Sequence, residues 1–161
     1  MYSYAKDETV NNFWKSVLAE FIVASSLDII NTDCEALTAP CRTFDLLYNN
    51  KYGIAVKSAA YVQSHSAEHP DHITFSIETD QTSNETGYFC NAYIFCVYTA
   101  MSINENPLDM NLWDFYVLPA KNIDREMPNQ KIITLPSLLT LNPIKCTYLE
   151  LKETVDKILA V

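Results

Sequence analysis

The chain has few glycines, few histidines and few basic residues. Its 161 residues include two glycines, three histidines, and 11 lysines and arginines against 20 aspartates and glutamates. Two glycines cannot build a glycine-rich phosphate-binding loop, which excludes a nucleotide-binding motif of that kind. A formal net charge of −9 argues against a protein that binds nucleic acid through a broad basic surface. It leaves room for an enzyme whose carboxylates hold a metal beside a local basic patch.

Long hydrophobic runs and paired cysteine motifs are also absent from the sequence. No stretch of about 18 apolar residues predicts a membrane span, and the first residues lack the pattern of a signal peptide. The cysteines are odd in number and form no C-x-x-C pair: Cys34, Cys41, Cys90, Cys96 and Cys146. We therefore expect a cytoplasmic protein with reduced cysteines in its core, no zinc site and no contact with a membrane.

What the chain has is enough apolar and aromatic material for one folded domain over residues 1–161. It is 48% hydrophobic and contains ten tyrosines, seven phenylalanines and two tryptophans. We expect Trp113 and most of the tyrosines to lie in the core rather than to stack on nucleobases.

Helices are expected near both ends of the chain. Within residues 9–28 apolar side chains recur at helical spacing, and we expect them to face the core: Phe13, Val17, Phe21 and Ala24. Glu20 shares their face, where a carboxylate is costly unless it is paired, holds a metal or reaches solvent at the edge of the apolar stripe. Residues 147–160 predict a second helix that begins at a capping box of Thr147 and Glu150.

Between the helices the pattern predicts strands, while residues 29–42 and 80–87 are expected to be irregular. The expected strands are residues 42–48 and 53–61, which form a hairpin around Asn49, Asn50 and Gly53, and residues 72–78, 88–100 and 113–118, the last ended by Pro119. The most apolar run, residues 88–100, is expected to be a buried central strand. The order predicts a mixed central sheet flanked by helices, of the α/β or α+β type.

The predicted hairpin carries an acid and a lysine that could take part in catalysis. Because side chains alternate along a strand, Ala55 and Lys57 share one face, and Asp45 on the preceding strand can lie beside them. Glu20 would complete a cluster if the first helix projects it to the same place. Two acids, a lysine and Mg²⁺ suit phosphodiester hydrolysis, since the metal activates water and the lysine stabilises developing negative charge. By spacing alone, an acid and a lysine on neighbouring strands also fit a plain ion pair.

Two other groups of residues are weaker candidates. His65, His69 and His72 lie close together in sequence, but Pro70 breaks the helix that their spacing would need to bind a metal. We expect a solvated loop there. Basic residues that could gather into a phosphate-binding patch are Lys51, Lys57, Lys121, Arg125 and Lys131.

The run FDLLYNNKYGIAVKSAAYVQS resembles the PD-(D/E)XK restriction-endonuclease-like nucleases, in a subgroup whose core strand commonly reads like I-E-V-K-S-x-A-Y-x-Q. The later run YIFCVYTAMSINENPLDMNLWDFYVLPAKNI and the early run LAEFIVASSLDI are similar to that subgroup in the same order. The resemblance covers roughly residues 15 to 140. It implies a restriction-endonuclease-like mixed central sheet flanked by helices.

The resemblance also implies roles for individual residues. Asp45 would be the central metal ligand, Lys57 the catalytic lysine, Glu20 a further ligand, Gln63 a supporting or backbone-contacting residue, and the carbonyl of Val56 part of the metal shell. The metal would be Mg²⁺, with Mn²⁺ as a substitute. The implied substrate is nucleic acid, DNA in preference to RNA, and the implied assembly is a homodimer with a role in defence or a mobile element.

Position 55 departs from that pattern, because Ala55 stands where the family has Glu or Asp. Three explanations are open: an engineered knockout, a natural member kept as a noncatalytic binding or assembly module, or migration of the acid to another element such as Glu78. Removal of one metal carboxylate without replacement should weaken metal binding strongly, since ligand number sets affinity at an oxygen site.

Overall fold

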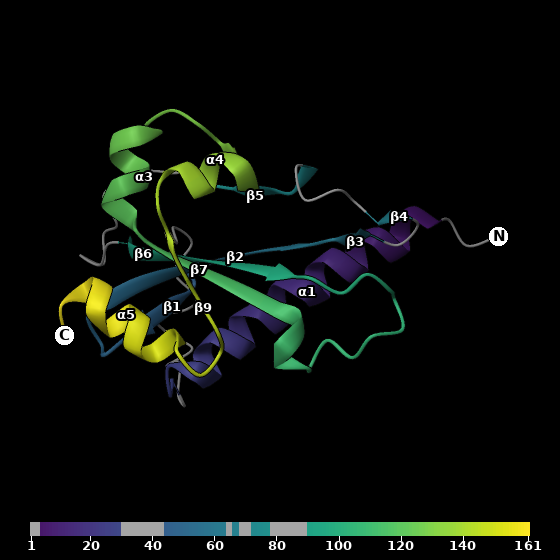
Figure 1. Ribbon diagram of the computed structural model, residues 1–161, viewed down its shortest axis with the longest axis horizontal. Coiled ribbons are helices and arrows are strands. Elements are labelled where there is room, and N and C mark those ends of the chain that lie inside the picture. Colours follow the sequence, from purple (N-terminus) through teal and green to yellow (C-terminus); the bar gives the residue numbers. More distant parts are fainter. Residues whose placement is uncertain (1–3, 30–43, 64–65, 68–71, 78–89) are drawn as a thin grey trace.

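The computed structural model describes residues 4–29, 44–63, 66–67, 72–77 and 90–161, and shows a mixed α/β architecture (Figure 1). The helices and strands, in chain order, are α1 (Tyr4–Ser26), β1 (Leu46–Tyr48), β2 (Tyr52–Ala60), β3 (Val62–Gln63), β4 (Ser66–Ala67), β5 (Thr74–Ser76), β6 (Cys90–Tyr98), the 3-10 turn η2 (Met110–Leu112), β7 (Trp113–Pro119), α3 (Ala120–Glu126), β8 (Ile132–Thr134), α4 (Leu135–Thr140), β9 (Ile144–Cys146) and α5 (Leu151–Leu159).

Within the described part of the chain, the central sheet has five strands in the order β1-β2-β6-β7-β9. Only β2 and β6 run parallel, and the other three pairs are antiparallel. The strand β6 lies between β2 and β7, and its side chains from Ala92 to Tyr98 are all buried. This is the position that the most apolar run of the sequence predicts. The expected strand at residues 72–78 is shorter, and it pairs with β8 outside the central sheet.

Helices lie on both sides of this sheet (Figure 1), and an apolar cluster fills the space on each side. On one face, α1 and α5 pack over side chains that include Ile54, Val56 and Phe115. On the other, α3, α4 and the β5–β8 pair pack over Ala55, Tyr93 and their neighbours. Each strand of the centre therefore contributes alternate residues to two different cores, and the predicted sheet with helices on both sides is confirmed at this level.

The predicted core face of the first helix is wrong for three of its four residues, whereas the fourth, Ala24, packs against the core. Phe13, Val17 and Phe21 are 64%, 41% and 65% exposed, while the residues that meet the sheet are the small or branched Ala19, Ile22 and Val23. Because α1 carries apolar side chains on more than one side, the sequence offers two stripes. The stripe around Ala19 lets the helix backbone approach the sheet closely, so it takes the inner position.

The end of the chain also differs from expectation. Thr147 donates its N–H to the Glu150 carboxylate at 2.8 Å, so the predicted contact between this pair exists. It closes a turn ahead of the helix, which begins only at Leu151. The segment between β7 and this turn forms α3, β8, α4 and β9, which no clear periodicity in the sequence indicated.

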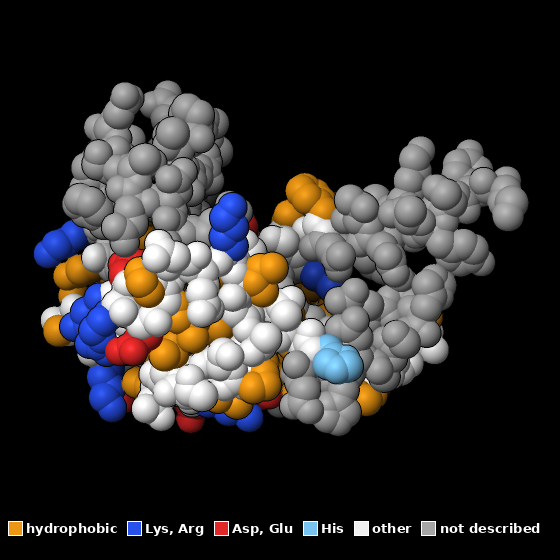
Figure 2. Space-filling model, turned by 90° about the horizontal axis from the view of Figure 1, so that it is seen from above, with side chains coloured by type: hydrophobic (Ala, Val, Ile, Leu, Met, Phe, Trp, Pro, Cys, Tyr) orange, Lys and Arg blue, Asp and Glu red, His pale blue; other side chains and the backbone are white. Residues whose placement is uncertain are grey.

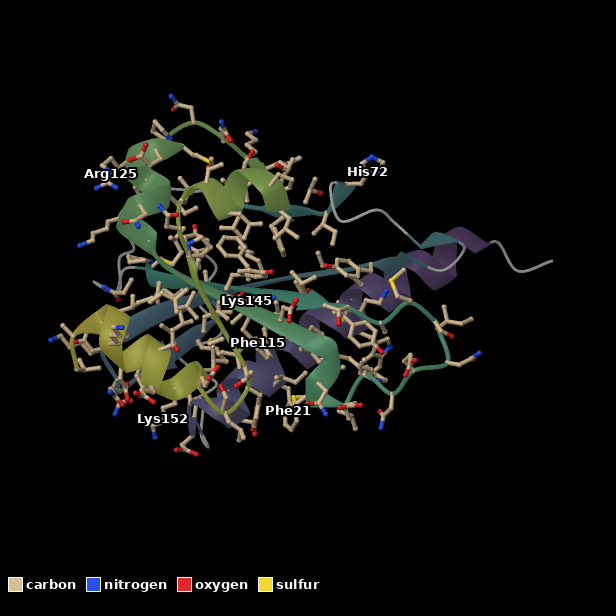
Figure 3. The ribbon with its side chains drawn as sticks, viewed as in Figure 1. Phe21, His72, Phe115, Arg125, Lys145 and Lys152 are labelled. Carbon is tan, nitrogen blue, oxygen red and sulfur yellow. The ribbon has the colours of Figure 1, made fainter. Side chains whose placement is uncertain are left out.

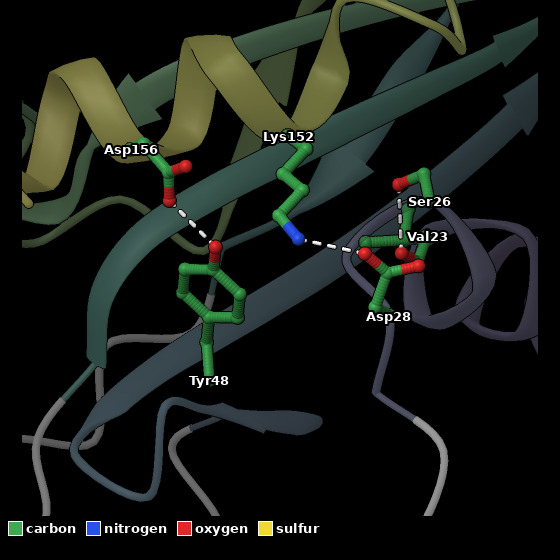
Figure 4. A network of polar contacts seen from close by, with 6 residues as sticks. All are labelled: Val23, Ser26, Asp28, Tyr48, Lys152 and Asp156. Atoms are coloured by element: carbon green, nitrogen blue, oxygen red, sulfur yellow. Dashed lines mark hydrogen bonds and ion pairs between the residues drawn. The ribbon is translucent and has the colours of Figure 1, made fainter.

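Polar contacts tie α5 to the strand hairpin and to the end of α1 (Figure 4). The Tyr48 hydroxyl donates to Asp156 at 2.5 Å, and the Lys152 ammonium pairs with Asp28 at 2.6 Å. The second pair is solvent-exposed and therefore contributes little to stability. Burial, together with Asp156, raises the pKa of Tyr48 from 10.0 to about 12.

We expect Tyr48→Phe to lower the free energy of unfolding by about 1.5–3 kcal/mol, the usual value of a hydrogen bond to a charged group. Since the pKa of Tyr48 is raised from 10.0 to about 12, its stabilising effect is complete below pH 10 and is lost as the pH rises towards 12. Urea unfolding of both proteins should show their difference shrinking across this range. A difference that stays constant through pH 12 would contradict the role of Tyr48.

Candidate functional site at the start of the first hairpin

The turn between β1 and β2 sets the register of the hairpin. Asn49 and Asn50 both have positive φ, of 53° and 54°, a conformation that asparagine tolerates better than most residues. The turn brings Tyr48 opposite Tyr52 and Leu46 opposite Ile54. Gly53, which was expected in the turn, lies instead within β2 at a bulge beside β6.

Asp45 extends this register by one residue and lies beside Ala55. Its N–H donates to the Ile54 carbonyl at 2.9 Å, and its side-chain Oδ2 accepts the Val56 N–H at 2.7 Å. The carboxylate thus accepts the hydrogen bond that a backbone carbonyl would accept if β1 were longer. The Val56 carbonyl is directed to the same edge, because the N–H and C=O of one strand residue point the same way.

Ala55 and Lys57 point to the same face of β2, as strand alternation predicts. Ala55 is 1% exposed, pairs with Tyr93 in the β2–β6 register and belongs to the core beneath α3 and α4. Lys57, two residues on, is half-buried. The position where a second acid was expected is therefore filled by a methyl group packed among aromatic side chains.

Three further residues lie around Ala55 that the sequence did not indicate. The pKa of the Cys90 thiol is raised to about 12, mainly by burial and to a smaller extent by the charges of Asp124 and Asp45. A hydrogen bond with the Ala55 backbone and the charge of Lys57 act in the opposite direction. The pKa of Tyr93 is also raised, first by burial and then by Cys90, Asp124 and Asp45.

Asp124 is exposed on α3, and its charge acts in the same direction as that of Asp45 on both Cys90 and Tyr93. Tyr93 could have been inferred from alternation along β6. Asp124 could not, because nothing in the sequence predicted the helix that carries it.

The other predicted site residues lie elsewhere or outside the description. Glu20 is half-buried on α1, the helix that packs against the face of Ile54 and Val56 rather than the face of Ala55 and Lys57. Gln63 belongs to the short β3, outside the central sheet, and its side chain is outside the described residues. Glu78, the alternative acid, also lies outside them.

His65 and His69 lie outside the described residues, so the expected solvated loop stays a prediction. His72 is exposed and lies well apart from Arg125 in Figure 3. In the described ranges no three His, Cys, Asp or Glu side chains come together in a way that could hold a metal ion. The described donors near Ala55 do not by themselves fit a Mg²⁺ site: Asp45 offers one carboxylate, and one of its oxygens accepts a backbone hydrogen bond.

Among the described residues on the face seen in Figure 2, the basic side chains are interspersed with acidic, apolar and other side chains. Arg125 pairs with Glu126 at 2.8 Å, and the Lys51 ammonium lies 5.0 Å from the centre of the Tyr52 ring. The expected local phosphate-binding patch thus remains a prediction.

The predictions for the cysteines and Trp113 can be compared with the described part of the chain. Cys90, Cys96 and Cys146 are free thiols, the last two buried, whereas Cys34 and Cys41 lie outside the described residues. Trp113 is buried, and its indole N–H donates to the Pro107 carbonyl at 2.8 Å, which confirms a core role. Among the described helices, none is long and apolar enough to cross a membrane.

Searches against protein-family models, curated proteins and solved structures give no significant match to this chain. The features that bear on function are therefore the geometry around Asp45, Ala55 and Lys57 and the sequence resemblance.

Proposed function

We propose that the chain has the scaffold of a metal-dependent nuclease of the PD-(D/E)XK type, with a restriction-endonuclease-like fold. Its partner is nucleic acid, DNA in preference to RNA, and Ala55 leaves the chain without efficient hydrolytic activity. The supporting sequence pattern is the hairpin with its acid and lysine, followed by the two later runs similar to the same family.

The observation that carries the proposal is the placement of Asp45, Ala55 and Lys57. The Asp45 carboxylate is fixed by the Val56 N–H at 2.7 Å, beside the residue that the family pattern makes an acid. Lys57 lies two residues after Ala55 and projects from the same face of β2. A glutamate at position 55 would add a second carboxylate next to Asp45, and two carboxylates are a typical protein contribution to a Mg²⁺ site.

With alanine at position 55, the described residues near Asp45 supply few ligands for a catalytic metal. In nucleases a bound divalent metal activates water and neutralises charge on phosphate oxygens. The described residues offer one carboxylate where that chemistry needs more donors, so no hydrolytic step is assigned to this chain. Lys57 keeps the role of a cation beside the scissile phosphate, where it would offset negative charge.

Restoring the acid tests the proposal. We expect Ala55→Glu to cleave plasmid DNA, and RNA more slowly, in millimolar Mg²⁺ or Mn²⁺, because it completes the pair of carboxylates. Adding Lys57→Met to this variant should lower cleavage by about 100-fold or more, the typical effect of removing one electrostatic stabiliser. Agarose gel assays with and without a chelator measure both results.

Ala55→Gln is the matched control, since glutamine has the shape of glutamate without its charge. It should fold like the glutamate variant and remain inactive. A folded Ala55→Glu protein that cleaves neither DNA nor RNA with either metal would count decisively against the nuclease scaffold.

One observation favours a second candidate, a noncatalytic binding module on the same fold. Ala55 is 1% exposed and packs in the same core as Tyr93 and Phe95, so the local structure has accommodated a methyl group as part of its core. Binding of labelled DNA by the unaltered chain without cleavage would support this candidate. Binding that Lys57→Met does not weaken would place the contact elsewhere.

A further inference from the structure

A buried tyrosine lies next to position 55 on the neighbouring strand. Tyr93 is opposite Ala55 in the parallel register of β6 and β2, and both side chains belong to the core beneath α3 and α4. Tyr93 is 4% exposed and Ala55 is 1% exposed. A longer side chain at position 55 would therefore extend alongside the tyrosine ring.

The Tyr93 hydroxyl makes no hydrogen bond to any residue that the structure describes. Buried tyrosine hydroxyls usually have a partner, because an unpaired donor in the core costs free energy. The ring itself is held in place, since it stacks on Phe95 with centres 5.6 Å apart, and Phe75 meets Phe95 edge to face. The hydroxyl thus has a fixed position from which it can donate to an acceptor that reaches it.

The charges that act on this hydroxyl come from the candidate site. Burial raises the pKa of Tyr93 first, and Cys90, Asp124 and Asp45 raise it further. The phenol therefore keeps its proton at neutral pH and remains a hydrogen-bond donor. An ionised carboxylate can only accept, so it is a suitable partner for such a donor. Lys57, which projects from the same face of β2 as Ala55, supplies a positive charge nearby.

A glutamate at position 55 would be long enough to reach the hydroxyl. Neighbouring strands lie about 4.8 Å apart. Glutamate extends its carboxylate well beyond Cβ, along the distal half of the tyrosine ring. A small lean of either side chain then brings the two groups to hydrogen-bond length, about 2.5–2.7 Å for a hydroxyl that donates to a carboxylate.

We propose that Tyr93 is the positioning residue for an acid at position 55, and that its hydroxyl donates a hydrogen bond which holds that carboxylate beside Asp45. This role rests on the proposed function, which assigns an acid to position 55. Hydrogen bonds of this kind orient the ligands of metal sites and raise their affinity for the metal. With Ala55, the hydroxyl lacks this acceptor.

A double-mutant cycle tests the proposal without metal or nucleic acid. Adding Tyr93→Phe to Ala55→Glu should raise the equilibrium constant for unfolding by about tenfold or more, because it removes a hydrogen bond to a charged group. In the unaltered chain, Tyr93→Phe should leave that constant unchanged or lower it, since no acceptor is lost there. Urea unfolding of the four proteins in the presence of a chelator measures both effects.

Tyr116→Phe is the matched control. Tyr116 is 7% exposed in the same core, but it lies on β7, two strands away from β2. Its substitution should change the unfolding constant by the same factor with alanine or glutamate at position 55. If Ala55→Glu does not fold, Ala55→Gln replaces it in the cycle, because its amide oxygen accepts the same hydrogen bond; a neutral acceptor should give a coupling of about fivefold.

NMR provides a readout that a purely structural role of Tyr93 would not change. In a protein with ¹³C-labelled tyrosine, the Cζ resonance of Tyr93 should move downfield in Ala55→Glu, because donation to a carboxylate gives the phenol some phenolate character. The Cζ resonance of Tyr116 should stay in place.

Two results would overturn the role of Tyr93: an equal effect of Tyr93→Phe with alanine and with the acceptor at position 55, or an unmoved Tyr93 resonance in folded Ala55→Glu. The nuclease assignment fails separately. Coupling in an Ala55→Glu protein that cleaves no nucleic acid keeps the role of Tyr93 and removes the nuclease, whereas cleavage without coupling does the reverse.

Discussion

Phe115→Ala is expected to lower the free energy of unfolding by about 4 kcal/mol, a large share of the stability of a domain of this size. Phe115 is 0% exposed at the middle of β7, between Cys96 on β6 and Cys146 on β9 (Figure 3). Its ring stacks near that of Trp113, with centres 6.4 Å apart. Truncation removes the ring and leaves a cavity. Because β7 is hydrogen-bonded to β6 on one side and β9 on the other, it cannot easily move to close that cavity.

Urea unfolding followed by circular dichroism measures this loss as a lower midpoint with an unchanged slope. Phe115→Leu is the matched control, because it keeps most of the volume and should cost about 1–1.5 kcal/mol. A loss below about 1 kcal/mol for the alanine variant would mean that the core around β7 is not packed as described.

Ala55→Glu is expected to lower the free energy of unfolding by about 3 kcal/mol when no divalent metal is present. The position is 1% exposed and lies beside the Asp45 carboxylate, so the new charge is both desolvated and repelled. Ala55→Gln shares the added volume without the charge and should cost about 1–2 kcal/mol. The difference between the two variants isolates the carboxylate.

Magnesium should stabilise the glutamate variant alone. A ligand that binds only the folded state, present at ten times its dissociation constant, adds about 1.4 kcal/mol. Thermal or urea unfolding in Mg²⁺, with Na⁺ at matched ionic strength as the reference, measures this term separately from catalysis. Equal stabilisation of the glutamate and glutamine variants would show that position 55 and Asp45 do not share a metal.

The hairpin was predictable from the sequence because its information is local. Asn49 and Asn50 specify a tight turn, alternation then fixes which residues share a face, and the register places Asp45 beside Ala55. The surrounding elements were less predictable. Residues 120–146 form short helices and strands that depend on docking against the sheet, and so the proximity of Asp124 to this site had no signal in the sequence.

The first helix shows the opposite case, in which a clear pattern was misassigned. Phe13, Val17 and Phe21 follow the helical period, and the sequence alone favoured them as the core face. The sheet selects Ala19 and Val23 instead, because small side chains permit closer packing than aromatic ones. Because α1 packs against the sheet in this way, Glu20 lies on a helix that covers the face of Ile54 and Val56.

By itself, then, the sequence determined the local facts: an acid-bearing and a lysine-bearing strand joined by a tight turn, with Ala55 on the lysine's face. These follow from turn chemistry and the two-residue period of a strand. Only the tertiary structure decided that Ala55 is enclosed in a core, that Asp45 is held by Val56, and that α1 turns its aromatic side chains outward. Those outcomes depend on which surfaces pack most closely across the sheet, a competition among distant residues that no local pattern encodes.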